Sequence, residues 1–230
     1  GGLLHQSWRD SSGDRAADGH GVFDEDGWPL GPRVAVAAVQ ALAWRALAEH
    51  AAVFDPATEP AAAKAARCFD ACFLGGDVPA FAVDGERTVA TVTSDLGHLL
   101  WTGILDRHPP ERERAVAVLT SPELATGYGV RTLGVSNPAF DPAGYHSGAV
   151  WPWDSWIAAG GLEAASPGAG REAAAGVAAA LGELGGYPEC YAVDLAGRLR
   201  PVPEANHHQA WTVGAAIAID TSWDGRAWST

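Results

Sequence analysis

Asp10 is the residue of this chain that is best placed to act as an acid. It directly follows Trp8 and Arg9. A carboxyl group beside an indole is partly desolvated, and desolvation raises its pKa, so that it can hold a proton near neutral pH. Cleavage of a glycosidic bond needs such an acid and a second carboxylate on the other face of the bond. The segment Asp10–Gly13 is also typical of a simple turn, so it does not decide the chemistry alone.

Four other blocks combine aromatic, basic and acidic side chains that could share a site with Asp10. Aromatic rings stack on the apolar faces of sugar rings, and carboxylates, guanidinium groups and amides form hydrogen bonds with hydroxyls. Together the blocks predict a carbohydrate-binding pocket. In chain order they are Thr93–Gly103 with His98 and Trp101, Tyr128–Leu133 with Arg131, Tyr145–Asp154 with His146 and Trp151, and Tyr187–Tyr191 with Glu189, followed by Gln209 and Trp211.

The composition argues against several partners. A formal charge of -13 disfavours nucleic acid and anionic membrane surfaces, because phosphate groups must be met by clustered Lys and Arg. No apolar run is long enough to cross a bilayer and no signal peptide is visible, so we expect a cytoplasmic protein. The three Cys form no disulfide or zinc pattern, and the adjacent His207 and His208 point to opposite sides. We therefore expect no metal and no cofactor.

The elements that must position these blocks are mainly helices. Helical spacing and start signals predict helices over residues 32–50, 58–74, 110–119, 150–162, 169–184 and 207–219, and another that begins after Ser94. A turn signal within 78–93 predicts a short hairpin, and no other segment predicts a strand. We interpret the acidic residues Asp24, Glu25 and Asp26 as a solvated turn, with a calcium site as the alternative. The long connections 120–149 and 186–206 hold most of the candidate residues, which favours a functional role.

The helices therefore predict an all-α fold in a single domain over residues 1–230. Helical hairpins with long loops between them suggest a barrel or solenoid, in which the loops gather at one end over a cavity.

The ordered blocks resemble the C-terminal amylo-α-1,6-glucosidase domain of bacterial glycogen debranching enzymes. That domain is one of the (α/α)6-barrel glycosidases, with trehalase, the processing α-glucosidases and glucoamylase. The resemblance extends in order over almost the whole chain, and its motifs are weak singly but specific together. It implies an oligosaccharide or glycogen-like glucan as substrate.

The resemblance also implies roles for individual residues. Asp10 would be the general acid and Glu189 the general base of an inverting glycosidase. An inverting mechanism places the two carboxyl groups about 6.5–9.5 Å apart, with a water molecule between the base and the anomeric carbon. The implied substrate-binding residues are Trp8, Arg9, Gln40, His98, Trp101, Arg131, Tyr145, His146, Trp151, Asp154, Gln209 and Trp211.

The chain departs from the family pattern at several places. His5-Gln6-Ser7-Trp8 stands where the family has Asn-Gln-Gly-Trp, and Ala38 replaces a Glu that commonly precedes Val39-Gln40. The loop from Val193 to Glu204 is less aromatic than in the family. These departures bear on the choice of substrate more than on the acid and base. Asp14 is the alternative acid if the first block is aligned differently.

The resemblance further implies that the barrel is incomplete. A barrel of six hairpins needs about twelve helices, and the sequence predicts roughly seven. We expect the first helices to lie in a missing N-terminal part of the same protein, so that residues 1–230 are part of a catalytic domain. The alternative is a non-catalytic carbohydrate-binding domain derived from such an enzyme.

Overall fold

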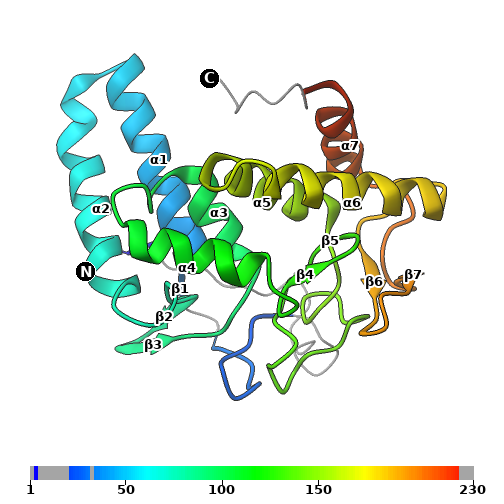
Figure 1. The fold of residues 1–230 in the computed structure, drawn as a ribbon. Helices are drawn as coiled ribbons and strands as arrows, with labels where there is room; N and C mark the ends of the chain where they lie inside the picture. The colour runs from blue at the N-terminus through cyan, green and yellow to red at the C-terminus, as the bar shows by residue number, and fades with distance from the viewer. Residues whose placement is uncertain (1–2, 5–20, 32–33, 223–230) are drawn as a thin grey trace.

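A computed structural model describes residues 3–4, 21–31 and 34–222 of the chain (Figure 1). Trp8, Arg9, Asp10 and the alternative acid Asp14 lie outside these residues. About half of the described chain is helical. Its helices are α1 (Ala37–Val53), α2 (Glu59–Phe73), α3 (Asp95–Thr102), α4 (Pro109–Leu119), α5 (Pro152–Ala165), α6 (Ala169–Leu184) and α7 (Ala210–Ser222), with a 3-10 turn at Pro56–Thr58 between α1 and α2.

Three small antiparallel sheets accompany the helices, so the described chain is helix-rich rather than all-α, and the (α/α)6 barrel stays a prediction. The expected hairpin is present, and β1 joins it to form a three-stranded sheet. The other two sheets are hairpins of two or three residues per strand, too short to give a clear alternating pattern. The strands are β1 (Ala35–Val36), β2 (Ala82–Asp84), β3 (Arg87–Val89), β4 (Ala125–Thr126), β5 (Gly129–Val130), β6 (Tyr191–Val193) and β7 (Leu199–Pro201).

Most helix predictions hold to within a few residues. Helix α2 begins at Glu59 with a proline in its first turn, and its residues Ala62, Ala66, Phe69 and Phe73 are buried at helical spacing. The first long helix was expected to begin at Pro32, but α1 begins at Ala37. The reason is that Ala35 and Val36 pair with Val83 and Ala82 of β2.

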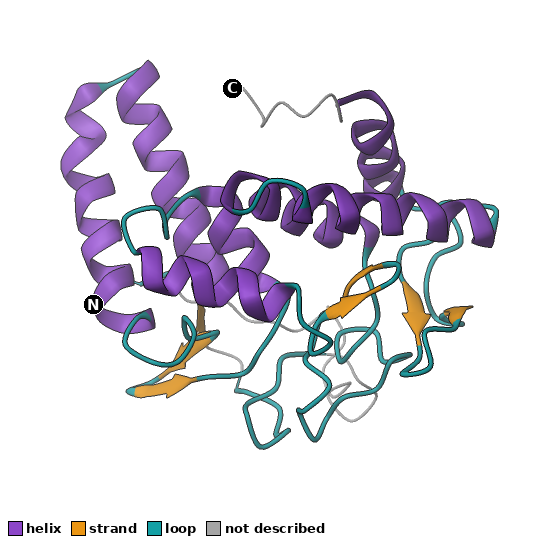
Figure 2. Ribbon diagram, in the orientation of Figure 1, coloured by secondary structure: helices purple, strands orange, loops and turns teal. Residues whose placement is uncertain are grey.

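The helices pack as consecutive hairpins. Helices α1, α3, α5 and α7 contact one another in this order, while α2 packs on α1, α4 on α3 and α5, and α6 on α5 and α7. Figure 2 shows the strands and long loops gathered on one side of α3–α6. The structure thus confirms the expected gathering of the loops.

Glycine allows α3 and α5 to approach closely. A Cβ atom added at Gly97 would lie 2.4 Å from Cβ of Ala158, and one at Gly161 would lie 2.6 Å from the Gly97 oxygen. Both distances are far inside van der Waals contact, so neither position accepts a side chain without a shift of the helices. This contact fixes α3 against the middle of α5.

Asp24 holds the loop 21–31 against the hairpin β2–β3. Its Oδ1 accepts hydrogen bonds from the amides of Asp26 (3.1 Å) and Trp28 (2.8 Å), and its Oδ2 accepts two bonds of 3.1 Å from Arg87. Asp24 is buried, whereas Glu25 and Asp26 are exposed. The interpretation of all three as a solvated turn is therefore wrong for Asp24, because Arg87 compensates its charge.

Candidate functional site

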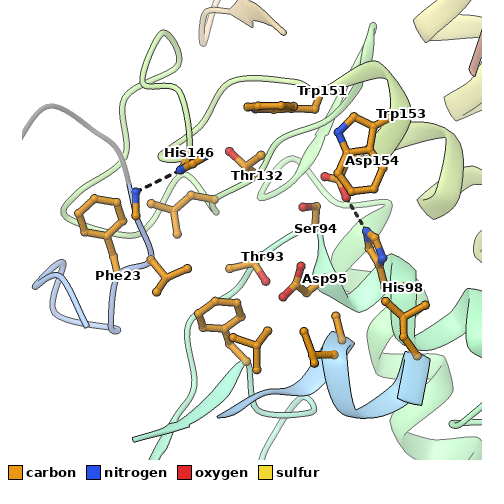
Figure 3. Close-up of a pocket in the computed structure, with 18 of the residues that line it drawn as sticks. Phe23, Thr93, Ser94, Asp95, His98, Thr132, His146, Trp151, Trp153 and Asp154 are labelled. Atoms are coloured by element: carbon orange, nitrogen blue, oxygen red, sulfur yellow. Dashed lines mark hydrogen bonds and ion pairs between the residues drawn. The ribbon is translucent and has the colours of Figure 1, made fainter. Parts of the chain in front are cut away.

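A pocket of about 300 Å³ opens where the loops meet the first turns of α3 and α5 (Figure 3). Its surface is predominantly apolar and aromatic, with a few polar side chains. This composition is usual for a site that binds a small molecule. The described lining residues are Gly21, Val22, Phe23, Val36, Ala38, Val39, Leu42, Phe81, Thr93, Ser94, Asp95, His98, Thr132, Leu133, His146, Trp151, Trp153, Asp154 and Trp211.

Aromatic rings form one wall of this pocket. The ring of Trp151 lies 6.4 Å from that of Trp211 and 5.7 Å from that of His146. Trp151 donates a hydrogen bond of 2.8 Å from its Nε1 to the backbone carbonyl oxygen of Tyr145. The Tyr145 ring contacts the Trp151 ring edge-on. Trp211 is 47% exposed, so part of its ring is accessible at the mouth of the pocket.

Three of the titratable side chains that line the pocket lie together on α3 and α5. His98 on α3 and Asp154 on α5 are both buried, and Nε2 of His98 lies 2.7 Å from Oδ1 of Asp154. The close contact of α3 with α5 brings these two residues together. Asp95 lies in the first turn of α3, three residues before His98, and therefore on the same face of the helix.

The environment shifts the pKa of two of these groups. Burial raises the pKa of Asp95 to about 6; the charge of His98 opposes the increase and that of Asp154 adds to it. Burial alone would lower the pKa of His98, but the hydrogen bond and charge of Asp154, with the charge of Asp95, raise it above its usual value. His98 is therefore stabilised as an imidazolium between two acidic groups.

Several polar atoms of this group have no hydrogen-bond partner among the described residues. They are Oδ2 of Asp95, Oδ2 of Asp154, Nδ1 of His98 and Nε1 of Trp153, and all four are buried. Figure 3 shows the carboxyl groups of Asp95 and Asp154 and the indole nitrogen of Trp153 turned toward the pocket. Unpaired buried donors and acceptors are unfavourable unless a water molecule or a ligand meets them. Sugar hydroxyls both donate and accept, so they suit this set.

Glu189 is buried and is not one of the described residues that line the pocket. Two residues after Glu189, Tyr191 exchanges backbone hydrogen bonds of 2.8 and 3.0 Å with Val150. This pairing fixes the backbone that carries Glu189. Oε1 of Glu189 accepts one bond of 3.0 Å from Gln209, and Oε2 accepts two from Asn206, of 3.0 and 3.2 Å. A carboxylate has about four lone-pair sites, so Oε1 can accept one further donor such as water.

Five predicted substrate-binding residues are not among the described residues that line the pocket: Gln40, Trp101, Arg131, Tyr145 and Gln209. The side-chain amide of Gln40 forms hydrogen bonds of 2.7 and 2.8 Å with the backbone of Leu4. The side-chain amide of Gln209 donates a hydrogen bond to Glu189. The buried guanidinium of Arg131 donates a hydrogen bond to the backbone carbonyl oxygen of Val193 and lies over the Phe140 ring. Trp101 lies on α3 and is 36% exposed, but it is not among the described lining residues.

The other described candidates gather at the pocket. His98, His146, Trp151, Asp154 and Trp211 line it, and Tyr145 contacts Trp151. The predicted acid Asp10, with Trp8 and Arg9, lies outside the described residues, so its distance from Glu189 stays a prediction.

The prediction missed Asp95, Asn206 and the apolar side of the pocket. Asp95 carried one usable signal, its spacing of three residues from His98 in a predicted helix. Asn206 offered none, because its contact with Glu189 depends on the path of a loop. The apolar side, which includes Phe23 and Phe81, comes from segments far apart in the chain.

An aromatic pocket with buried carboxyl groups, in a fold of packed helical hairpins, defines a protein of the carbohydrate-processing class. The chain belongs to the MGH1-like glycoside hydrolases. Residues 5–212 match the family described as the mannosylglycerate hydrolase MGH1-like glycoside hydrolase domain. The expected class, glycoside hydrolase, is thereby confirmed, but the match is not to a debranching-enzyme domain.

Solved structures show the same fold. The GH63 mannosylglycerate hydrolase from Thermus thermophilus, in complex with Tris and D-glycerate, aligns with a TM-score of 0.65 and 18% identity over 81% of this chain and 46% of that chain. The same enzyme in complex with glucose aligns with a TM-score of 0.62, 18% identity, and coverage of 81% and 45%. The chain thus spans less than half the length of these structures.

No curated protein matches the chain. Within the described ranges, no group of three His, Cys, Asp or Glu side chains is arranged to hold a metal ion, and no helix has the length and apolar character needed to cross a membrane.

Proposed function

We propose that this chain is part of an inverting glycoside hydrolase that cleaves an α-glucosidic bond of an oligosaccharide or glycogen-like glucan. The main support is the match to a glycoside hydrolase family over most of the chain, together with the aromatic pocket over buried carboxyl groups. The amylo-α-1,6-glucosidase type of linkage, a cytoplasmic location and a closed (α/α)6 barrel completed by further N-terminal helices are parts of the same proposal.

In the proposed mechanism Glu189 is the general base. The three bonds from Asn206 and Gln209 fix the orientation of its carboxyl group and leave one acceptor site on Oε1. A water molecule bound there would lose its proton to Glu189 as it attacks the anomeric carbon.

Asp10 is the general acid of the proposal. It would protonate the departing glycosidic oxygen from the other face of the sugar, with its carboxyl group about 6.5–9.5 Å from that of Glu189. Trp151 and Trp211 would stack on the sugar ring, while Asp154 and His146 would bind its hydroxyls.

The mechanism is tested by Glu189→Gln in the intact protein. The amide cannot accept a proton from water, so we expect kcat to fall at least about 10³-fold with little change in sugar affinity. Release of reducing sugar from maltose and isomaltose measures activity, and proton NMR at early times should show the β-anomer as first product. The matched control is Glu204→Gln, which changes an exposed carboxylate in the loop after β7 and should keep full activity.

Either of two results would contradict the mechanism. One is a Glu189→Gln protein that retains substantial activity, and the other is an α-anomer as the first product. Asp10→Asn should likewise abolish hydrolysis, and if Asp14→Asn does so instead, the acid is Asp14.

One observation favours a second function, carbohydrate binding without catalysis. Glu189 is buried, it is not among the described lining residues, and both of its oxygens already accept hydrogen bonds. Calorimetry that shows glucose binding by the intact protein, with no turnover of maltose, isomaltose or mannosylglycerate, would support this second function against the first.

A further inference from the structure

We propose that Asp95 is a further sugar-binding residue, which accepts a hydrogen bond from a hydroxyl of an uncharged sugar and disfavours a sugar acid in the same place. The inference rests on the proposed function, because it concerns the substrate class of the same pocket. Neither its geometry nor its test depends on the identity of the general acid or base.

The first observation is the unpaired oxygen of Asp95. Its Oδ2 is buried without a hydrogen-bond donor in the described part of the chain, and so is Oδ2 of Asp154. Both residues line the pocket, and Figure 3 shows both carboxyl groups pointing into it. A buried carboxylate oxygen without a donor is strongly unfavourable, so the empty acceptor sites fit a ligand that brings hydroxyl groups.

The second observation is the charge of the pocket. No Lys or Arg is among its described lining residues. The groups that act on Asp95 are the cationic His98 and the carboxylate of Asp154. His146 accepts a hydrogen bond on Nδ1 from the Gly21 amide, 3.1 Å away, and is thus neutral in this arrangement. Among the described lining residues, one imidazolium between two carboxylates leaves a net negative charge.

This charge discriminates between ligands. A neutral hydroxyl donates to a carboxylate, whereas the carboxylate of a sugar acid is repelled by it in a site of low dielectric. Trp153 adds an unpaired indole N–H beside the carboxylates, which can donate to the oxygen of the same or a neighbouring hydroxyl. The arrangement therefore favours an uncharged hexose over its uronic acid.

Protonation of Asp95 should weaken this selectivity. Burial raises the pKa of Asp95 to about 6, so at pH 7.5 it is an anion and at pH 5 it is mostly neutral. A neutral carboxyl group repels a sugar acid less than a carboxylate does, and it presents one acceptor oxygen fewer.

The test compares the binding of D-glucose and D-glucuronate, two ligands that differ only at C6. Isothermal titration calorimetry at pH 7.5 measures both for the intact protein, for Asp95→Asn and for the control Asp77→Asn, an exposed carboxylate away from the pocket. We expect the unchanged protein and the control to prefer glucose at least about tenfold. Asp95→Asn should bind glucose about tenfold more weakly and lose most of the preference. At pH 5 the unchanged protein should move toward the Asp95→Asn values.

Several results would overturn the inference. They are an unchanged preference in Asp95→Asn, equal binding of the two sugars by the unchanged protein, or binding of neither. Thermal unfolding checks the fold of the variant, and if Asp95→Asn does not fold, Asp95→Ser is judged by the same criteria. A protein that shows the expected preference but hydrolyses no α-glucoside would end the proposed function and leave this inference standing.

Discussion

His98 is the residue around which the charges of the pocket are organised. Its Nε2 lies 2.7 Å from Asp154, and Asp95 lies one helical turn away. Two buried carboxylates without this cation would repel each other, and one of them would be protonated. His98 therefore positions Asp154 and permits two acidic groups to share one apolar pocket.

Asp95 should make the stability of the protein depend on pH. Its pKa rises from 3.8 in the unfolded chain to about 6 in the fold, so the folded state binds its proton more tightly. This contribution to stability is fully present below about pH 4 and is lost as the pH rises through 6. The shift corresponds to roughly 3 kcal/mol.

The measurement is urea unfolding of the unchanged protein and Asp95→Asn from pH 4 to pH 7. Relative to the variant, the unchanged protein should lose about 2–3 kcal/mol over this range. Comparison of the two proteins cancels the titration of all other groups except those coupled to Asp95, namely His98 and Asp154. Parallel curves would mean that Asp95 is well solvated.

At the scale of elements, local signals determined how much could be predicted. Helix α6 occupies Ala169–Leu184, the range predicted from its pattern of small apolar residues. The start of α1 could not be predicted, because Ala35 and Val36 pair with residues almost fifty positions away. The short strands β4–β7 carry no pattern of their own, and they form where loops meet. The aromatic and acidic blocks were recognisable, but the pairing of His98 with Asp154 depends on how α3 packs on α5.

The contact between α3 and α5 can be tested with a single methyl group. Gly97→Ala places a Cβ atom 2.4 Å from that of Ala158, so the helices must separate. We expect a loss of about 1–3 kcal/mol in the free energy of unfolding. The His98–Asp154 bond should lengthen, and affinity for glucose should fall with it.

Gly182→Ala is the matched control for this prediction. Gly182 lies within helix α6, and an added Cβ would meet no atom within 4 Å. Alanine there should stabilise the protein by about 0.5–1 kcal/mol, because it restricts the unfolded chain. Urea unfolding measures both variants, and a Gly97→Ala protein as stable as the unchanged one would show that α3 and α5 can shift freely.

At the scale of the whole molecule, the pocket is assembled from segments that span nearly the full described chain. One apolar side comes from loop 21–31 and β1, the polar part from α3 and α5, and the aromatic wall from residues 145–153 and Trp211. The loop 21–31 is joined to distant segments by the side chains of Asp24 and Asn137. Nδ2 of Asn137 donates to the backbone carbonyl oxygen of Asp24 at 2.8 Å. The helices form a scaffold, and a few long-range polar contacts fix the loops on it.

This division predicts that the loop can be loosened without unfolding the scaffold. Asp24→Asn replaces a carboxylate oxygen that accepts two bonds from Arg87 with an amide, which cannot keep both charge-assisted bonds. A loss of about 1.5–3 kcal/mol should be local. Amide hydrogen exchange in residues 21–31 should become about 10–100-fold faster, while amides of α3 and α5 keep their protection. Asp26→Asn, an exposed neighbour in the same turn, should change neither. Equal acceleration in the loop and in the helices would mean that Asp24 supports the whole fold rather than one wall of the pocket.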